Sequence, residues 1–166
     1  MYHKKAFIKN SKEIYYDIWL MGNKKSKVAL QNATVVMDTL DTAGDFDNIA
    51  HLVAKDAPFM CQADALKDIS TVERYMEWMT GFATNIAPGC SYKIHCTSCD
   101  EGTEMVSSFR TFTAKHTGEA GPVPATNKET NTDYCYIVKM DDDHKVESLT
   151  KVWNDGNAFK DLGWAP

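Results

Sequence analysis

The sequence predicts an α+β fold, in which helices from the first half of the chain pack against an antiparallel sheet built by the second half. Two observations lead to this class. Apolar residues recur at helical spacing up to about residue 87, and apolar and polar residues alternate in short segments after residue 90. A parallel α/β domain would instead alternate helices with strands. The length of 166 residues is that of one domain with a sizeable core.

The first half of the chain predicts three helices. Apolar residues recur at helical spacing over residues 29–40, and Gly44 ends this first helix. Asp45 is placed to cap a second helix, which ends near Pro58. Ser70 and Glu73 match a capping box at the start of the third helix. The apolar face of this third helix consists of Val72, Tyr75, Met76, Met79, Phe82 and Ile86.

The second half of the chain predicts a meander of strands, over residues 91–99, 104–116, 131–140 and 145–154. Turn signals stand at residues 100–102 and 141–143. The segment 118–128 is rich in Gly, Pro, Thr and Asn and predicts a long loop between two strands. A short C-terminal helix is expected after Asp155.

The N-terminal segment differs from the rest of the chain in charge. Residues 1–27 contain seven lysines against Glu13 and Asp17, while the whole chain carries a net charge of −5. We therefore divide the chain into a basic extension, 1–27, and a domain, 28–166. Residues 12–21 fit a short helix or a strand, and residues 22–27 have the composition of a linker. The extension is expected to be a solvated arm or, alternatively, an arm that binds a partner.

Composition narrows the classes of function. The acidic net charge disfavours nucleic-acid binding, and no apolar run reaches the ~18 residues of a membrane span. Five irregularly spaced cysteines and no visible secretory signal favour a reduced, cytoplasmic compartment. Cys96 and Cys99 would point to opposite faces of a strand, which opposes a shared metal ion. No nucleotide-binding, hydrolase or metalloprotease motif is present, so we expect no metal and no cofactor.

One segment has a sequence typical of a known family. Residues 116–127 read HTGEAGPVPATN, which resembles the signature of the SnoaL-like polyketide cyclases, members of the nuclear transport factor 2-like superfamily. The helix junction at residues 40–46 and the segment 152–163 are similar to two further parts of that family. The resemblance covers about residues 28–165. It implies a cone-shaped, curved antiparallel sheet of about four to six strands, wrapped around three N-terminal helices and followed by a short C-terminal helix.

The same resemblance implies a small-molecule pocket inside the cone and a dimer formed through the outer face of the sheet. Catalytic members of the family carry an acid/base aspartate in the last strand. In this chain the aligned positions are Leu149, Thr150 and Lys151, and Asn154 stands where a second aspartate is usual. This departure argues against the family's standard aldol cyclisation, because fold alone does not specify chemistry.

The strand 104–116 carries two candidate functional residues. Alternation places Arg110, Phe112 and His116 on one face, with Arg110 and His116 about 20 Å apart at ~3.3 Å per residue. A buried Arg110 would need an anionic ligand or a carboxylate, for which helix acids such as Glu73 or Glu77 are candidates. His116 is the candidate general acid or base, with a structural role in capping the loop as the alternative.

The remaining candidate ligand-binding residues are aromatic or apolar. Trp78 lies on or beside the apolar face of the third helix, Tyr134 and Tyr136 share a strand face, and Trp153 belongs to the last strand. Each is also explained by an ordinary core position. With Arg110, the predicted binding set is Tyr75, Trp78, Met79, Phe82, Phe112, Tyr134 and Trp153.

The sequence thus predicts a small-molecule-binding protein of the SnoaL-like type. Its chemistry would be proton transfer, such as cyclisation, isomerisation or dehydration, on an apolar or aromatic ligand with a carbonyl or hydroxyl group. A non-catalytic binding protein and a protein-interaction module on the same fold are the alternatives. The expected partners are this ligand and a second copy of the chain, with no nucleic acid and no membrane.

Overall fold

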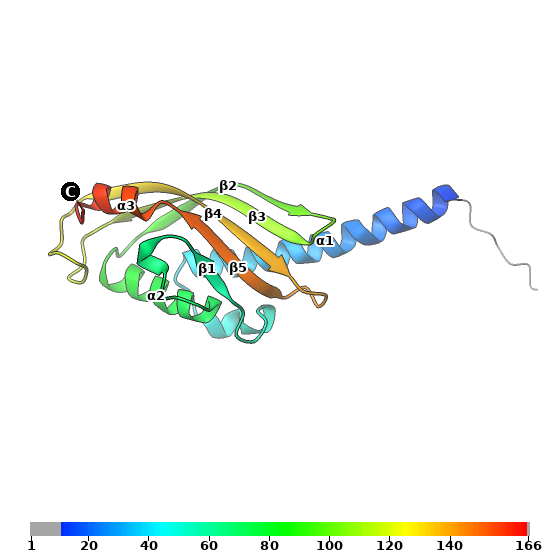
Figure 1. Cartoon of the computed structure of the whole chain (residues 1–166), viewed down its shortest axis with the longest axis horizontal. Coiled ribbons are helices and arrows are strands. Elements are labelled where there is room, and N and C mark those ends of the chain that lie inside the picture. The colour runs from blue at the N-terminus through cyan, green and yellow to red at the C-terminus, as the bar shows by residue number, and fades with distance from the viewer. Residues whose placement is uncertain (1–10, 166) are drawn as a thin grey trace, which may run out of the picture.

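The computed structural model describes the backbone of residues 11–165 and the side chains of residues 24–165. Two long helices lie beneath a curved sheet, and a third, short helix lies at one end of it (Figure 1). The first half of the chain contains, in order, α1 (Ser11–Asp41), the short 3-10 turns η1 (Phe46–Asn48) and η2 (Ala50–Leu52), β1 (Phe59–Cys61), a third 3-10 turn η3 (Asp64–Leu66) and α2 (Val72–Asn85). The second half contains β2 (Ser91–Asp100), β3 (Met105–Lys115), β4 (Glu129–Met140), β5 (Val146–Trp153) and α3 (Asp155–Leu162).

The five strands form one sheet in the order β1-β5-β4-β3-β2. Strands β2 to β5 form the predicted antiparallel meander, and their bounds agree with the sequence prediction within two residues. The α+β class is therefore confirmed. One correction concerns β1, which pairs in parallel with β5 and makes the sheet mixed. Strand β1 was not predicted because alternation cannot be recognised in only three residues.

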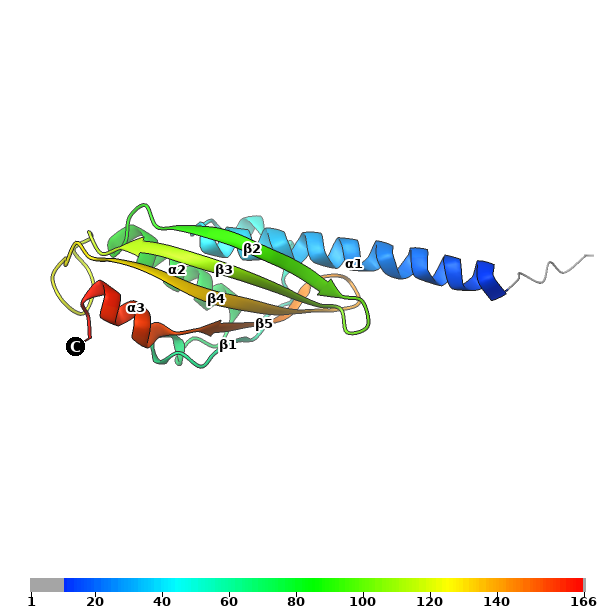
Figure 2. The ribbon, with the colours of Figure 1, turned by 90° about the horizontal axis from the view of Figure 1, so that it is seen from above.

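The helices cover only one face of the sheet. Strand β3 alternates between exposed and buried positions, with Val106, Ser108, Arg110, Phe112 and Ala114 buried. Helix α2 buries the predicted apolar face against these strands. Figure 2 looks onto the opposite face of β2 to β5, which no helix in the described part of the chain crosses. The core therefore lies between the sheet and the helices.

Helix α1 is longer than the sequence predicted. It runs without a break from Ser11 to Asp41, so the prediction of a linker over residues 22–27 is wrong. Lysine is a good helix former and a single Gly22 costs only about 1 kcal/mol, so the composition of this segment does not stop a helix. The boundary drawn between residues 27 and 28 falls inside α1, whose N-terminal part extends beyond the rest of the fold (Figures 1 and 2). Residues 1–10 of the predicted extension lie outside the described residues.

Two helix starts differ in detail from their predictions. Asp45 caps a 3-10 turn rather than a full helix, since its side chain accepts a hydrogen bond from the backbone N–H of Asp47 at 3.1 Å. Helix α2 is capped by Thr71, one residue after the predicted Ser70. The carbonyl of Ser70 instead accepts a hydrogen bond from the N–H of Phe59. No helix within residues 11–165 is both long enough and apolar enough to span a membrane.

Candidate active site

The candidate active site begins with a carboxylate at the end of α1. Arg110 Nη1 donates a hydrogen bond to Asp41 Oδ2 at 2.8 Å, Tyr134 donates to the same oxygen at 2.5 Å, and Tyr136 donates to Oδ1 at 2.8 Å. Asp41 is buried, with 2% of its surface exposed. Both carboxylate oxygens are therefore satisfied by side chains from the inner face of β3 and β4.

Asp41 is a residue that sequence reasoning missed as a functional candidate. It follows Ala33 and Met37 at intervals of four, so it continues the buried face of the first helix. A charged residue on an apolar helical face is rarely buried without a partner. That signal was present in the sequence, but the partners lie about seventy to a hundred residues away and only the fold identifies them.

Arg110 is fully buried and paired with acids of α1. Its Nη1 lies 2.9 Å from Asp38 Oδ1 as well as 2.8 Å from Asp41, and its Nε donates to Ser108 Oγ at 2.9 Å. Burial is the largest single influence and would lower the pKa of Arg110, but the charge and hydrogen bond of Asp41, together with Tyr134 and Asp38, outweigh it and the pKa is raised. The suggestion that Glu73 or Glu77 pairs with Arg110 is wrong, because Glu77 pairs with Arg74 on the exposed side of α2.

Lys151 is a second buried cation, on the inner face of β5. Its Nζ donates a hydrogen bond to Tyr75 Oη at 2.7 Å and lies 4.5 Å from the centre of the Tyr134 ring and 5.2 Å from that of Trp153. No carboxylate of the described residues comes within ion-pair distance of this nitrogen. Burial lowers the pKa of Lys151 to about 8, because the charged form is poorly solvated.

Hydrogen bonds connect Lys151 to Asp41 through two tyrosines. The hydroxyls of Tyr75 and Tyr136 are 2.9 Å apart. The single hydroxyl hydrogen of Tyr136 is donated to Asp41, so Tyr75 must be the donor to Tyr136 and the acceptor from Lys151. Burial, and next the charge of Asp41, raise the pKa of both tyrosines well above the usual value. Both phenols therefore stay protonated and keep this chain of donors in one direction.

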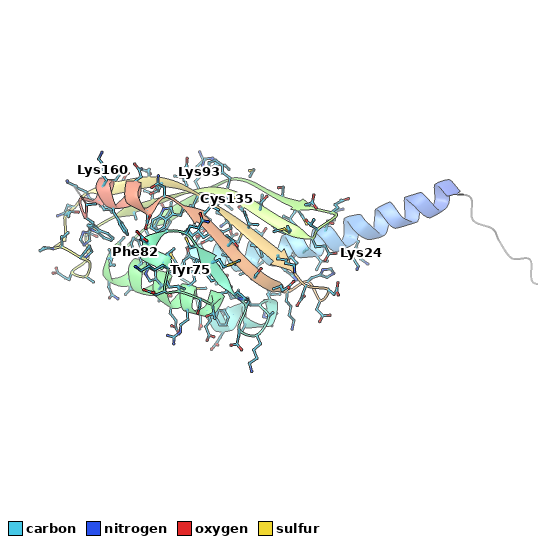
Figure 3. The ribbon with its side chains drawn as sticks, viewed as in Figure 1. Lys24, Tyr75, Phe82, Lys93, Cys135 and Lys160 are labelled. Atoms are coloured by element: carbon cyan, nitrogen blue, oxygen red, sulfur yellow. The ribbon has the colours of Figure 1, made fainter. Side chains whose placement is uncertain are left out.

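A narrow cavity lies beside Lys151. Its volume is about 20 Å³, which is room for about one water molecule. The wall includes Trp78, Met79 and Phe82 of α2, Phe112 of β3, Trp153 of β5 and Lys151, and α3 supplies much of the rest. Figure 3 labels Phe82 and Tyr75 on the side of α2 that faces the strands. A ligand larger than water would have to displace aromatic side chains.

The structure divides the predicted ligand-binding residues into two groups. Those in the cavity wall are Trp78, Met79, Phe82, Phe112 and Trp153. The other three, Tyr75, Arg110 and Tyr134, belong to the hydrogen-bonded cluster around Asp41 and Lys151. Lys151, which the sequence analysis treated only as a departure from the family pattern, contributes to both groups.

His116 lies apart from both groups, just after the end of β3, and is fully buried. Trp164 Nε1 donates a hydrogen bond to its Nδ1 at 2.9 Å, and its Nε2 lies 2.9 Å from the carbonyl oxygen of Ala120. An indole N–H can only donate, so Nδ1 is an acceptor and the ring proton is on Nε2. Both ring nitrogens are thus engaged in holding the loop, and the predicted catalytic role of His116 stays a prediction.

The last strand differs from the family pattern as the sequence suggested. Lys151 occupies the inner face where the resemblance implies an aspartate, and a carboxylate reaches the interior from α1 instead. Asn154 caps α3 by accepting a hydrogen bond from the N–H of Asn157 at 3.0 Å. Within residues 24–165, no group of three or more His, Cys, Asp or Glu side chains is arranged to hold a metal ion.

Comparisons with known proteins find similarity in structure only. No family model matches the sequence, and no curated protein matches it. A protein described as a SnoaL-like polyketide cyclase from Jannaschia matches with a TM-score of 0.68 at 9% identity, over 84% of this chain and 94% of the other. A polyketide cyclase candidate from Streptomyces antibioticus matches with a TM-score of 0.66 at 13% identity, over 81% and 98%.

An LEH-like epoxide hydrolase of M. tuberculosis is also similar, with a TM-score of 0.57 at 18% identity over 82% of this chain and 90% of the other. These matches cover nearly the whole of each neighbour, so the likeness concerns the complete domain. At such low identities the likeness shows the fold and not the activity. The chain therefore has the nuclear transport factor 2-like fold, which is the fold implied by the sequence resemblance of residues 116–127.

Proposed function

We propose that this protein binds a small, largely apolar carbonyl compound in the cavity and transfers a proton to or from it. The observation that carries the proposal is the environment of Lys151. Its amine is buried beside an apolar cavity, donates its hydrogen bond to Tyr75 and has no carboxylate partner among the described residues. An amine with a pKa of about 8 can both accept and donate a proton near neutral pH.

The proposed step uses residues that the fold already holds in place. The neutral amine of Lys151 takes a proton from the carbon next to the carbonyl group, and the ammonium that forms stands beside the enolate and stabilises its charge. Tyr75 keeps Lys151 oriented because its own hydroxyl is fixed by Tyr136 and Asp41. Arg110 balances the charge of Asp41, so that carboxylate does not have to pair with Lys151.

The structural neighbours support the class of ligand and not a particular reaction. Polyketide cyclisation and epoxide hydrolysis both act on oxygen-bearing organic molecules, and both activities are ascribed to proteins of this fold. The apolar wall of the cavity supports the same class of ligand, because a binding site of this kind holds apolar molecules with a few fixed polar groups. In this proposal His116 supports the loop, and Lys151 takes the acid/base role that the sequence suggested for His116.

Exchange of carbon-bound hydrogen tests the proposal. Butanone is incubated with the protein in deuterated water, and loss of its α-proton signals is followed by NMR. We expect the wild type to accelerate exchange and Lys151→Met to remove most of that acceleration. Lys139→Met is the matched control, because Lys139 is an exposed lysine of the neighbouring strand that pairs with Glu147.

Three outcomes would contradict the proposal of proton transfer by Lys151. One is equal exchange by the wild type and Lys151→Met, with both shown to be folded by circular dichroism. Another is loss of exchange in His116→Gln while Lys151→Met keeps it, which would return the acid/base role to His116. The third is binding of butanone without any exchange, detected by quenching of tryptophan fluorescence, which would favour a non-catalytic ligand-binding protein.

The outer face of the sheet favours a second role, self-association. Register places Cys96, Phe109, Cys135 and Val152 side by side across β2 to β5. Phe109 and Val152 are 39% and 56% exposed, and Figure 3 shows Cys135 on this uncovered side. We propose that a second copy of the chain covers this row. Sedimentation of the wild type and of Phe109→Asp tests it, since a dimer that is unaffected by the new charge would exclude this face.

A further inference from the structure

We propose that Lys151 acts as a covalent amine catalyst, whose Nζ forms an imine with the carbonyl carbon of a small aldehyde or ketone in the cavity. This inference rests on the proposed ligand class and goes beyond proton transfer. It assigns a bond-forming role to a residue that stands out in the sequence only as a departure from the family pattern.

Lys151 is unlike the other lysines whose side chains the structure describes. Between residues 24 and 165 it is the only buried one, at 6% exposure, and the others are exposed or half-buried. Exposed lysines are fully solvated ammonium ions at neutral pH and are therefore poor nucleophiles. A lysine desolvated in an apolar pocket is the kind of amine that reacts with carbonyl groups.

The surroundings of Nζ favour the neutral amine. An ammonium group has three hydrogens to donate, and the described residues provide one oxygen acceptor, Tyr75 Oη. The centres of four aromatic rings lie 4.5 to 5.5 Å from Nζ; such rings attract an ammonium ion, but they do not replace the hydration that burial removes. Asp41, the carboxylate of the cluster, accepts from Arg110 and two tyrosines instead. A neutral amine can donate one hydrogen to Tyr75 and keep its lone pair for a carbonyl carbon. The lowered pKa of Lys151 agrees with this geometry.

The reaction balances without any further reagent. The lone pair of Nζ forms a bond to the carbonyl carbon, and one N–H proton moves to the carbonyl oxygen to give a carbinolamine. The C–O bond then breaks with a second proton transferred to that oxygen, the C=N bond forms, and one water molecule leaves. This second proton comes from the nitrogen itself, while Tyr75 Oη holds Nζ in place by accepting its hydrogen bond. When protonated, the imine would acidify the neighbouring C–H bond more strongly than the free carbonyl does.

The cavity restricts the carbonyl compound to a narrow one. Its aromatic wall, which includes Trp78, Phe82 and Trp153, leaves space for about one water molecule. An unbranched aldehyde requires the smallest displacement of these side chains. We therefore take propanal as the probe.

Reductive trapping tests the inference on the wild-type protein. The folded protein is incubated with propanal and cyanoborohydride at pH 7, digested, and the propylated lysines are located by mass spectrometry. A pKa of about 8 leaves about one-tenth of Lys151 neutral at pH 7, whereas a lysine side chain in water is almost fully protonated at that pH. We expect labelling of Lys151 to exceed that of Lys139 by more than about tenfold at pH 7, with the ratio falling toward one by pH 10.

Variants separate the chemistry from folding and from access. Tyr75→Phe removes the hydroxyl and should slow trapping at Lys151 severalfold, while Lys139→Met should leave it unchanged. Lys151 labelled no faster than Lys139 in the folded wild type would overturn the inference. If butanone exchange depends on Lys151 but no adduct is trapped there, the inference fails and the proposed proton transfer stands. If neither occurs, both fail.

Discussion

Two buried cations on the inner face of one sheet are treated differently by this fold. Arg110 is held by Asp41 and Asp38 and by the hydroxyl of Ser108. Lys151 donates one hydrogen bond to a phenol and otherwise faces aromatic rings and a cavity. The pKa of Arg110 is raised because nearby Asp41 more than offsets burial, whereas burial lowers the pKa of Lys151 to about 8.

The difference shows how one interior can contain a structural and a reactive charge. Arg110 stays protonated and, with Asp41, forms a pair whose loss would leave a charge without a partner. Lys151 has no carboxylate within ion-pair distance among the described residues. Its charged form is therefore unfavourable, and its deprotonated form is accessible near physiological pH. We therefore assign stability to the Arg110 end of the cluster and chemistry to the Lys151 end.

The substitution Asp41→Asn tests the stabilising role of the Arg110–Asp41 pair and is expected to have the largest effect. The change removes the charge that balances Arg110 and weakens the acceptor for Tyr134 and Tyr136. We expect a loss of about 3 to 5 kcal/mol in the free energy of unfolding, because the buried guanidinium keeps only the partly exposed Asp38 as a charged partner. Unfolding in urea, followed by circular dichroism, measures it.

A double variant supplies the control for Asp41→Asn. Adding Arg110→Met removes the unpaired charge, so the double variant should be more stable than the sum of the two single losses predicts, by about 1 to 3 kcal/mol. Strictly additive losses would mean that the pair does not act as a unit.

The second test follows the stability of the protein as pH rises. Below about pH 8 Lys151 is protonated in both the folded and the unfolded chain. Between about pH 8 and 10.5 the unfolded chain binds a proton that the folded chain lacks, so this group makes stability rise with pH. By pH 9.5 the gain should reach about 2 kcal/mol.

Lys151→Met isolates that contribution from the other groups that titrate in the same range. The difference in unfolding free energy between wild type and variant should change by about 2 kcal/mol from pH 7 to 9.5. A difference that stays constant would mean that Lys151 titrates as an exposed lysine does, and the reactive role would lose its support.

A third test asks whether His116 contributes to stability, as Arg110 does, or to the chemistry, as proposed for Lys151. His116→Leu leaves the indole N–H of Trp164 and the carbonyl of Ala120 without their partner. We expect a loss of about 1 to 3 kcal/mol in stability. Butanone exchange per folded molecule should stay unchanged, and a loss of exchange in folded protein would place His116 in the reaction.

The smallest expected effect concerns the outer partner of Arg110. Asp38 is 37% exposed, so its contact with Arg110 is partly screened by solvent. Asp38→Asn should cost less than about 1 kcal/mol, and added salt should diminish the effect further. A loss as large as that of Asp41→Asn would show that both acids are needed to pair the guanidinium.

The sequence alone determined the features that depend on local periodicity. Alternation in the strand 104–116 placed Ser108, Arg110 and Phe112 on one face, and helical spacing identified the apolar face of α2. Both patterns follow from the geometry of a strand and of a helix, which repeat every two and every 3.6 residues. The class of fold followed from the order of these segments, and the segment His116–Asn127 carried the resemblance to the family.

Only the tertiary structure decided which side chains meet. Asp41 and Arg110 are 69 residues apart, and Tyr75 and Lys151 are 76 residues apart, so no local pattern relates them. The parallel pairing of β1 with β5 is equally remote in sequence. The pKa of Lys151 depends on burial and on the position of Asp41, which forms its ion pair with Arg110. Both are set by packing between distant elements. The sequence supplied two cations and one carboxylate for this interior, and the fold decided which cation the carboxylate neutralises.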